Sequence, residues 1–169
     1  MFRFLLYTSL LFAFGCQAID CSDYTELSVD QKERLAFSFR EGKTYNLGYT
    51  LASIALAESS AGKYRLNIHS KDLGLYQVNQ KTAQRELGIT NYYKQLELHQ
   101  KLIYDDQLGA YIAIKVLQHF DKGSYKDMVM SYNEGYRWRK DKESYKKALT
   151  YYTKVAYNVR MLKQCSNLN

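Results

Sequence analysis

One segment restricts the fold more than any other. Residues 48–60 are apolar or small on nearly every side of a helix, with a carboxylate, Glu58, close to the end. A helix that is apolar all round has no face to offer to water and is expected in the interior of a protein. The chain contains no proline, and apolar residues elsewhere also recur mostly at helical spacing. We therefore predict a buried central helix in a helical domain.

Helical spacing continues along most of the remaining chain. A capping box at Ser28–Gln31 opens a helix that we expect to run to about Gly42. Residues 63–78 are mixed in character and include a short extended run at 75–78. We therefore predict an all-α fold with a small extended element or hairpin around residues 63–78. The other helices are expected at residues 81–87, 93–104, 106–120, 124–132 and 142–162.

The first 18 residues have the features of a secretory signal peptide. Arg3 supplies a positive charge, residues 4–15 form an apolar run too short to span a bilayer comfortably, and Cys16-Gln17-Ala18 offers small residues for cleavage. We expect export to the periplasm or the extracellular space, with residues 19–169 forming a single domain without a membrane span. The alternatives are an uncleaved membrane anchor and a lipoprotein attached through Cys16.

Two cysteines remain in the exported chain, one near each end. Cys21 and Cys165 most simply form one disulfide that ties the termini together, and the alternative is two buried thiols. Such a bridge would close nearly the whole chain, and loop-closure entropy gives it roughly 4–5 kcal/mol at most. The histidines His69, His99 and His119 show no ligand-like pairing with either cysteine, so we expect no metal site.

The charge of the chain indicates a polyanionic partner. A net charge of +7 fits nucleic acid, acidic lipid or cell wall. The charges are spread along the sequence, and export argues against nucleic acid. Neither a clustered basic patch nor a basic amphipathic helix supports a nucleic-acid or membrane protein. The 17 tyrosines supply rings with a polar tip, some of which can line a sugar-binding cleft while most pack in the core or on the surface.

Glu58 is the first candidate for a functional group. At the C-terminal end of a buried helix, a carboxylate meets low polarity and the negative end of the helix dipole, and both raise its pKa. A glutamic acid that stays protonated near neutral pH is what a glycosidase needs to protonate a leaving oxygen. The alternative is a glutamate that turns outward from the helix end and is solvated.

Three short motifs follow one another in the sequence: Glu58-Ser59-Ser60, Gly-Leu-Tyr-Gln-Val-Asn at 74–79, and Ser-Tyr-Asn-Glu-Gly at 131–135. In order and spacing they resemble the E-S-S, G-L-M-Q and A-Y-N-x-G motifs of the soluble lytic transglycosylase (SLT) domain family, in the lysozyme-like superfamily. The resemblance covers roughly residues 45–158. It is closest to the small specialised members that are associated with secretion or conjugation. Further matching segments are residues 51–58, 106–117 and 152–155.

The resemblance implies a peptidoglycan lytic transglycosylase with a lysozyme-like fold. Glu58 would protonate the oxygen that joins N-acetylmuramic acid (MurNAc) to N-acetylglucosamine (GlcNAc). Its conjugate base would then accept the proton of the muramyl C6 hydroxyl as that oxygen closes on C1. The product is a 1,6-anhydromuramyl end, and the reaction needs no water, no cofactor and no second carboxylate, unlike the paired-carboxylate scheme.

The resemblance also assigns polar contacts around Glu58. Ser60 would hydrogen-bond the substrate or the surroundings of the acid, and Gln77 and Asn133 would contact N-acetyl groups. Simpler structural roles are open for two of them: Ser60 as a cap of the helix end, and Gln77 as a partner of a buried backbone group.

Two tyrosines belong to the same motifs. Tyr132 would hold the carboxyl of Glu58 in place through its hydroxyl, and the alternative is a plain core aromatic. Tyr76 stands where the family usually has methionine, which leaves an apolar wall of the substrate site and adds a hydroxyl. Ala61 replaces a usual phenylalanine and the Asn-Pro that normally follows is missing, so residues 62–73 have no secure alignment with the family.

Asp72 raises the possibility of a second carboxylate. It precedes Gly74 by two positions, which is where c-type lysozymes place their second carboxylate, ahead of a similar Gly-x-x-Gln-x-Asn run. Should Asp72 face Glu58 across the cleft, a hydrolytic muramidase becomes the alternative reading of the site. We favour a turn aspartate that bonds its own backbone, because specialised transglycosylases also tolerate aspartate at this position.

The partners follow from the same resemblance. We expect a monomer that acts on peptidoglycan glycan strands and serves a secretion, conjugation or phage lysis apparatus. A different class of function is also open, in which the chain is a non-enzymatic, wall-binding subunit of an envelope machine that has kept the fold. The presence of Glu58, Gln77, Tyr132 and Asn133 together argues for the enzyme.

Overall fold

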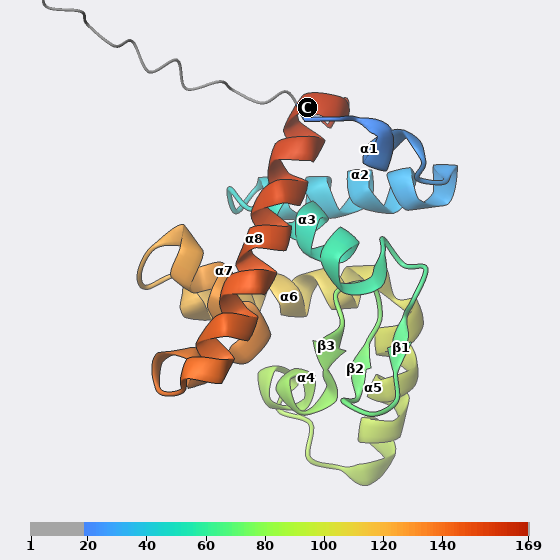
Figure 1. Ribbon diagram of the computed structural model, residues 1–169. Helices are drawn as coiled ribbons and strands as arrows, with labels where there is room; N and C mark the ends of the chain where they lie inside the picture. Colours follow the sequence, from blue (N-terminus) through green and yellow to red (C-terminus); the bar gives the residue numbers. More distant parts are fainter. Residues whose placement is uncertain (1–18, 169) are drawn as a thin grey trace, which may run out of the picture.

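The protein is mostly helical, with one small sheet. The computed structural model describes residues 19–168 (Figure 1), so the predicted signal peptide and Cys16 lie outside the described residues. This architecture confirms the predicted fold class. In chain order the elements are α1 Ser22–Thr25, α2 Val29–Lys43, α3 Gly48–Ser59, β1 Leu66–Asn67, β2 Asp72–Leu73, β3 Val78–Asn79, α4 Gln80–Leu87, α5 Tyr92–Tyr104, α6 Asp106–Phe120, α7 Tyr125–Glu134, the 3-10 helix η1 Arg137–Arg139 and α8 Lys142–Cys165.

Helix α3 is the predicted buried central helix. It packs against α2, α6 and α8, and Leu51, Ala52 and Ile54 are fully buried. Burying a leucine or isoleucine side chain contributes about 2 kcal/mol, so this helix is a large part of the core. The predicted capping box of α2 is also present, since the Ser28 hydroxyl accepts from the Gln31 amide and the Gln31 side chain accepts from the Ser28 amide.

The three strands form an antiparallel sheet in the order β1-β2-β3. The hairpin expected around residues 63–78 is present, but the extended run predicted at 75–78 is wrong for residues 75–77, which form the turn between β2 and β3. Two residues explain the turn, because Gly74 has φ 77° and Gln77 has φ 47°. A Cβ on Gly74 would lie 2.0 Å from the Leu102 carbonyl oxygen, so only glycine fits there.

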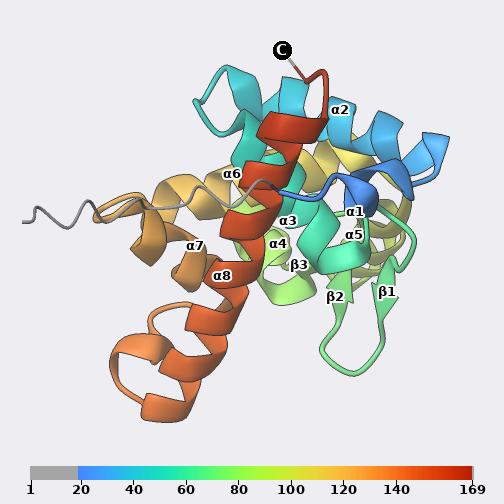
Figure 2. The ribbon, with the colours of Figure 1, turned by 45° about the horizontal axis from the view of Figure 1, so that its top comes forward.

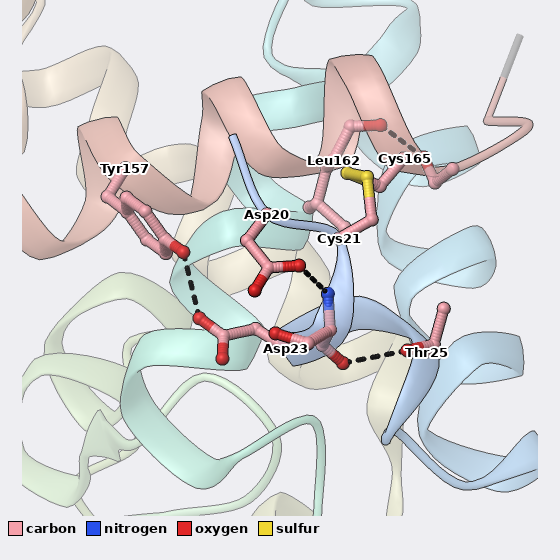
Figure 3. The surroundings of a disulfide bond; sticks show 9 residues. Asp20, Cys21, Asp23, Thr25, Tyr157, Leu162 and Cys165 are labelled. Atoms are coloured by element: carbon pink, nitrogen blue, oxygen red, sulfur yellow. Dashed lines mark hydrogen bonds between the residues drawn. A yellow bond between two sulfur atoms is a disulfide. The ribbon is translucent and has the colours of Figure 1, made fainter. Parts of the chain in front are cut away.

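The predicted disulfide is present between Cys21 and Cys165, whose Cα atoms lie 5.6 Å apart (Figure 3). It joins the segment before α1 to the end of α8. A second tie lies beside it, where the Tyr157 hydroxyl donates to the Asp23 carboxylate at 2.8 Å. The two ends of the described chain are therefore held side by side. The short helices α1 and η1 were not predicted from the sequence.

Helix boundaries agree closely with the sequence predictions. Helix α6 begins and ends as predicted, α4 ends at Gly88 in a left-handed cap, and α7 and α8 each extend a few residues further than expected. Within residues 19–168, no helix combines the length and the apolar character needed to cross a membrane.

Candidate active site

Glu58 lies in the last turn of α3, where the helix stops abruptly. Ser60 and Ala61 both have positive φ angles, 49° and 53°, and Gly62 continues this left-handed path at 87°. Non-glycine residues in this region carry strain that the surrounding structure must offset. A side chain of α2 holds the strained segment, since the side-chain amide of Gln31 donates to the Ser60 carbonyl at 2.8 Å.

The carboxyl of Glu58 has a pKa of about 7, well above its ordinary value of 4.5. Burial of the carboxyl is the largest cause, because removal from water disfavours the charged form. The negative charge of Asp72 raises the pKa further, whereas the Tyr151 hydroxyl and the Lys154 ammonium lower it. The side chain is only partly exposed, and that exposure opens into a cavity. The structure thus agrees with the raised pKa expected from the sequence.

Two residues of α8 reach the end of α3. The Lys154 ammonium donates to the Ala57 carbonyl at 2.6 Å, which satisfies one of the carbonyls left unpaired at a helix C-terminus. The Tyr151 hydroxyl is buried beside Glu58 and interacts with its carboxyl. Among the described residues, this hydroxyl has no partner at normal hydrogen-bond geometry, so the contact with Glu58 is looser than an ordinary hydrogen bond.

Glu58 and Asp72 open into one cavity of about 120 Å³, which we call the central cavity. Its walls come from six elements (α3, β2, β3, α4, α6 and α7) and from the turn before β3, and most of its side chains are polar. This brings together four of the residues predicted from the sequence: Glu58, Gln77, Asn133 and Tyr132, with Asp72 as a fifth. The full lining is Glu58, Asp72, Gln77, Val78, Asn79, Thr82, Val116, Tyr132 and Asn133.

The hydroxyl of Ser59, the residue after the acid, is held by hydrogen bonds at the end of α3. Ser59 is fully buried, and its hydroxyl donates to the Leu75 carbonyl at 2.6 Å and accepts from the Gly62 amide at 2.8 Å. It therefore fastens the end of α3 to the turn before β3. Ser60 is the C-cap residue of α3 and does not line the central cavity, which matches the capping alternative.

Tyr132 and Tyr76 are linked to one another. The Tyr132 hydroxyl donates to the Tyr76 carbonyl at 2.9 Å. The resemblance to the SLT family implied that this hydroxyl would hold the carboxyl of Glu58, but its proton is directed at the Tyr76 carbonyl instead. The Tyr76 side chain is fully buried, and its hydroxyl donates to the Ser38 hydroxyl at 2.9 Å. Its ring lies against Gly109. Tyr76 is therefore a core residue whose side chain cannot reach substrate in this conformation, in contrast to the predicted wall of the site.

Gln77 and Asn133 both line the central cavity. The Gln77 amide nitrogen donates to the Gly74 carbonyl at 3.0 Å and to the Tyr64 carbonyl at 3.3 Å, as the backbone-partner alternative expected. Its amide oxygen accepts no hydrogen bond from the described residues. Asn133 is exposed at the end of α7. Both amides are thus placed where they could contact polar groups of a ligand.

Asp72 lies on the central strand β2 and not in a turn. Its carboxylate accepts from the Asn79 side-chain amide at 2.9 Å, and the two residues are paired across the sheet. Asn79 also caps α4 by accepting from the Lys81 amide. The predicted turn aspartate is therefore wrong, and Asp72 shares the central cavity with Glu58.

Two further cavities share lining residues with the central cavity, and we call the three together the groove. The hairpin arm, of about 370 Å³, consists of Tyr64, Leu66, Asn67, Ile68 and His69, and shares Glu58 and Gln77 with the central cavity. The β1–β2 hairpin and the first turns of α8 project on the same side of the molecule, on either side of β3 and α4 (Figure 2). The lysine arm, of about 690 Å³, is lined by Asn133, Glu143, Lys146, Lys147, Thr150, Tyr151 and Lys154.

A comparison with protein families matches the transglycosylase SLT domain over residues 36–155. The match covers most of the chain. The chain belongs to the transglycosylase SLT domain family. Members of this family, which lies in the lysozyme-like superfamily, are lytic transglycosylases that act on peptidoglycan and are generally extracytoplasmic. No curated protein and no solved structure matches the chain.

The SLT match contains the whole groove. It begins within α2 and ends within α8, so every residue of the central cavity and of the two arms lies inside it. The disulfide and the segment before α2 lie outside the match. Within residues 19–168, no group of three or more His, Cys, Asp or Glu side chains is arranged to hold a metal ion.

Proposed function

We propose that this SLT domain cleaves the β-1,4 bond between MurNAc and GlcNAc without water, with Glu58 as both acid and base. The observation that carries the proposal is a carboxyl with a pKa of about 7 at the wall of an open cavity. Near neutral pH such a group is protonated in about half of the molecules. It can therefore give up a proton and take one back within the same catalytic cycle.

The proton balance of the reaction needs one carboxyl only. Glu58 in its acid form donates its proton to the bridging oxygen, and the bond from C1 of MurNAc to that oxygen breaks. GlcNAc leaves with a 4-hydroxyl. The C6 hydroxyl of the same muramyl residue attacks C1 to give the 1,6-anhydro ring, and its proton returns to the Glu58 carboxylate. The enzyme is regenerated without any other reactant.

The amides beside Glu58 would orient the substrate. Gln77 and Asn133 flank the central cavity and offer amide groups of the kind that pair with N-acetyl substituents. Tyr132 would act indirectly, since its hydroxyl fixes the backbone turn that carries Gln77. The hairpin arm, with the exposed ring of Tyr64 and the side chains of Leu66 and Ile68, supplies a surface on which sugar rings can stack.

A second candidate, hydrolysis, is favoured by one observation. Asp72 lines the same cavity as Glu58 and raises its pKa, so the two carboxyl groups are close enough to interact. In retaining glycosidases a second carboxylate stabilises or attacks C1 before water completes the reaction. Asp72 is held by Asn79 and by its strand, and we assign it the lesser role of a charged neighbour.

The products decide between the two reactions. Digestion of purified sacculi, followed by mass spectrometry of the soluble fragments, should give muropeptides that end in 1,6-anhydromuramic acid. Reducing muramyl ends without anhydro products would replace the proposal by hydrolysis. If the protein binds sacculi and releases no fragments under conditions in which a control muramidase clears them, the chain is a wall-binding subunit and not an enzyme.

A further inference from the structure

The two arms of the groove differ sharply in charge. Apart from Glu58, which it shares with the central cavity, the hairpin arm has no carboxylate, lysine or arginine in its lining. The lysine arm has three lysines and one glutamate. The larger arm is thus cationic, and the first turns of α8, which carry Lys146 and Lys147, lie across β3 and α4 from the β1–β2 hairpin of the uncharged arm (Figure 2). In a strand that bears its stems, the lactyl carboxyl of each muramyl residue is tied up as an amide, so the sugars are uncharged and the free carboxylates belong to the stems.

The positive charge of the lysine arm is only partly neutralised. Glu143 pairs with Lys147 at 2.9 Å, and Lys154 is tied to the Ala57 carbonyl. Lys146 is exposed and has no ion-pair partner among the described residues. One lysine is therefore available to an anionic ligand without breaking an existing ion pair, and the other two add to the attraction at longer range.

The lysine arm is joined to the reacting centre by two residues. Asn133 lines both the arm and the central cavity. Tyr151 lines the arm, while its buried hydroxyl interacts with Glu58. The lysine arm therefore adjoins the position of the sugar that reacts at Glu58. A group attached to that sugar can enter the arm directly.

We propose that the lysine arm binds the acidic peptide stem of the muramyl residue whose bond is cleaved, so that stem-bearing strands are better substrates than bare glycan. This inference rests on the proposed function. The stem is attached to C3 of muramic acid, the sugar whose C1 reacts beside Glu58. Its free carboxylates are complementary to Lys146 and to the other lysines of the arm, and the volume of about 690 Å³ accommodates several amino acids.

The test reverses one charge and measures a ratio of rates. Lys146→Glu and the control Lys115→Glu make the same change in net charge, and Lys115 is an exposed residue of α6 that lines neither arm. The initial rate of anhydro-end formation is measured for each protein on stem-bearing glycan chains and on chains stripped of stems by an amidase, which keep only the lactyl carboxylate on each muramyl residue. We expect the stem-bearing to stripped ratio to fall about fivefold in Lys146→Glu, to fall in the wild type with added salt, and to stay at the wild-type value in Lys115→Glu.

Three outcomes overturn the inference. In the first, the ratio of rates is the same in Lys146→Glu and the wild type. In the second, the ratio falls equally in Lys115→Glu, which would make the decrease an effect of net charge. Alternatively, stem removal changes nothing while an added anionic wall polymer inhibits the wild type and not Lys146→Glu, so that the polymer occupies the arm. Failure of the proposed function has a separate signature, because the wild type would then form no anhydro ends on either substrate.

Discussion

Glu58 and Asp72 share one cavity but are held there in different ways. Glu58 is at the end of a buried helix, where loss of water raises its pKa to about 7. Asp72 is on a strand of the small sheet, and an amide of the neighbouring strand donates to its carboxylate. Burial brings the pKa of Glu58 close to neutral pH, and the negative charge of Asp72 acts by raising that pKa further. In the proposed mechanism Glu58 is therefore the group that exchanges the proton, and Asp72 is its charged neighbour.

Replacement of Glu58 by glutamine should have the largest effect. Glu58→Gln keeps the shape of the side chain and removes the transferable proton, so we expect release of anhydro-muropeptides from sacculi to fall about 10³-fold. Binding to sacculi in a sedimentation assay should be retained, and it serves as the control for folding. Clearing of sacculi at the wild-type rate would remove Glu58 from the mechanism and end the distinction between the two carboxyl groups.

The same substitution should change the dependence of stability on pH. Because the folded-state pKa of Glu58 is raised from 4.5 to about 7, the folded protein binds this proton more tightly than the unfolded chain does. Its contribution to the free energy of unfolding is fully present below about pH 4.5 and is lost as pH rises towards 7, by roughly 3 kcal/mol at most. Glu58→Gln should lack this loss.

Denaturant titrations at pH 4 and pH 8 measure this effect. The decrease in unfolding free energy between the two values should be smaller in Glu58→Gln than in the wild type. Glu33→Gln, which removes an exposed carboxylate from α2, is the matched control and should behave as the wild type does. An equal decrease in unfolding free energy between pH 4 and pH 8 for Glu58→Gln and the wild type would show that burial does not penalise the charged form of Glu58.

Removal of the Tyr151 hydroxyl should have an intermediate effect. This hydroxyl lowers the pKa of Glu58, so Tyr151→Phe should raise that pKa and move the alkaline limb of the pH–rate profile to higher pH. The maximal rate should fall about fivefold as the carboxyl loses a contact that orients it. Tyr152→Phe is the control, because Tyr152 packs against Tyr125 and lines neither the central cavity nor the arms. A shift of the limb in Tyr152→Phe, or none in Tyr151→Phe, would contradict this role.

The helical part of the fold was predictable because its cause is local. Two features can be recognised within a single helix, without knowledge of its neighbours: the all-round apolar character of residues 48–60 and the capping box at Ser28. The turn at residues 75–77 was not predictable in the same way. It depends on Gly74 fitting against the Leu102 carbonyl and on the buried Ser59 hydroxyl, which are contacts between segments distant in sequence.

The site was predicted in part for the same reason. Motif order located Glu58, Gln77 and Asn133, but hydroxyl partners depend on packing, and Tyr132 and Tyr76 were assigned contacts that the structure places elsewhere. Tyr151 was missed, although a signal was present in the sequence. It falls on the same stripe of α8 as the buried residues Ala148, Val155, Asn158 and Leu162, and a tyrosine on the inward stripe of the last helix is a candidate to reach the centre.

Asp72→Asn should have the smallest effect, and in the opposite direction to Tyr151→Phe. Removing the negative charge lowers the pKa of Glu58, since Asp72 raises it, so the alkaline limb should move to lower pH. Asparagine can still pair with Asn79, and the rate at the optimum should stay within about tenfold of the wild type, with anhydro-muramyl ends as the product. A loss as deep as that of Glu58→Gln, together with reducing ends in the wild-type digest, would make Asp72 an equal partner in hydrolysis. Opposite limb shifts in the two variants would instead show that Glu58 alone titrates in the reaction and that its neighbours only set the pH at which it does so.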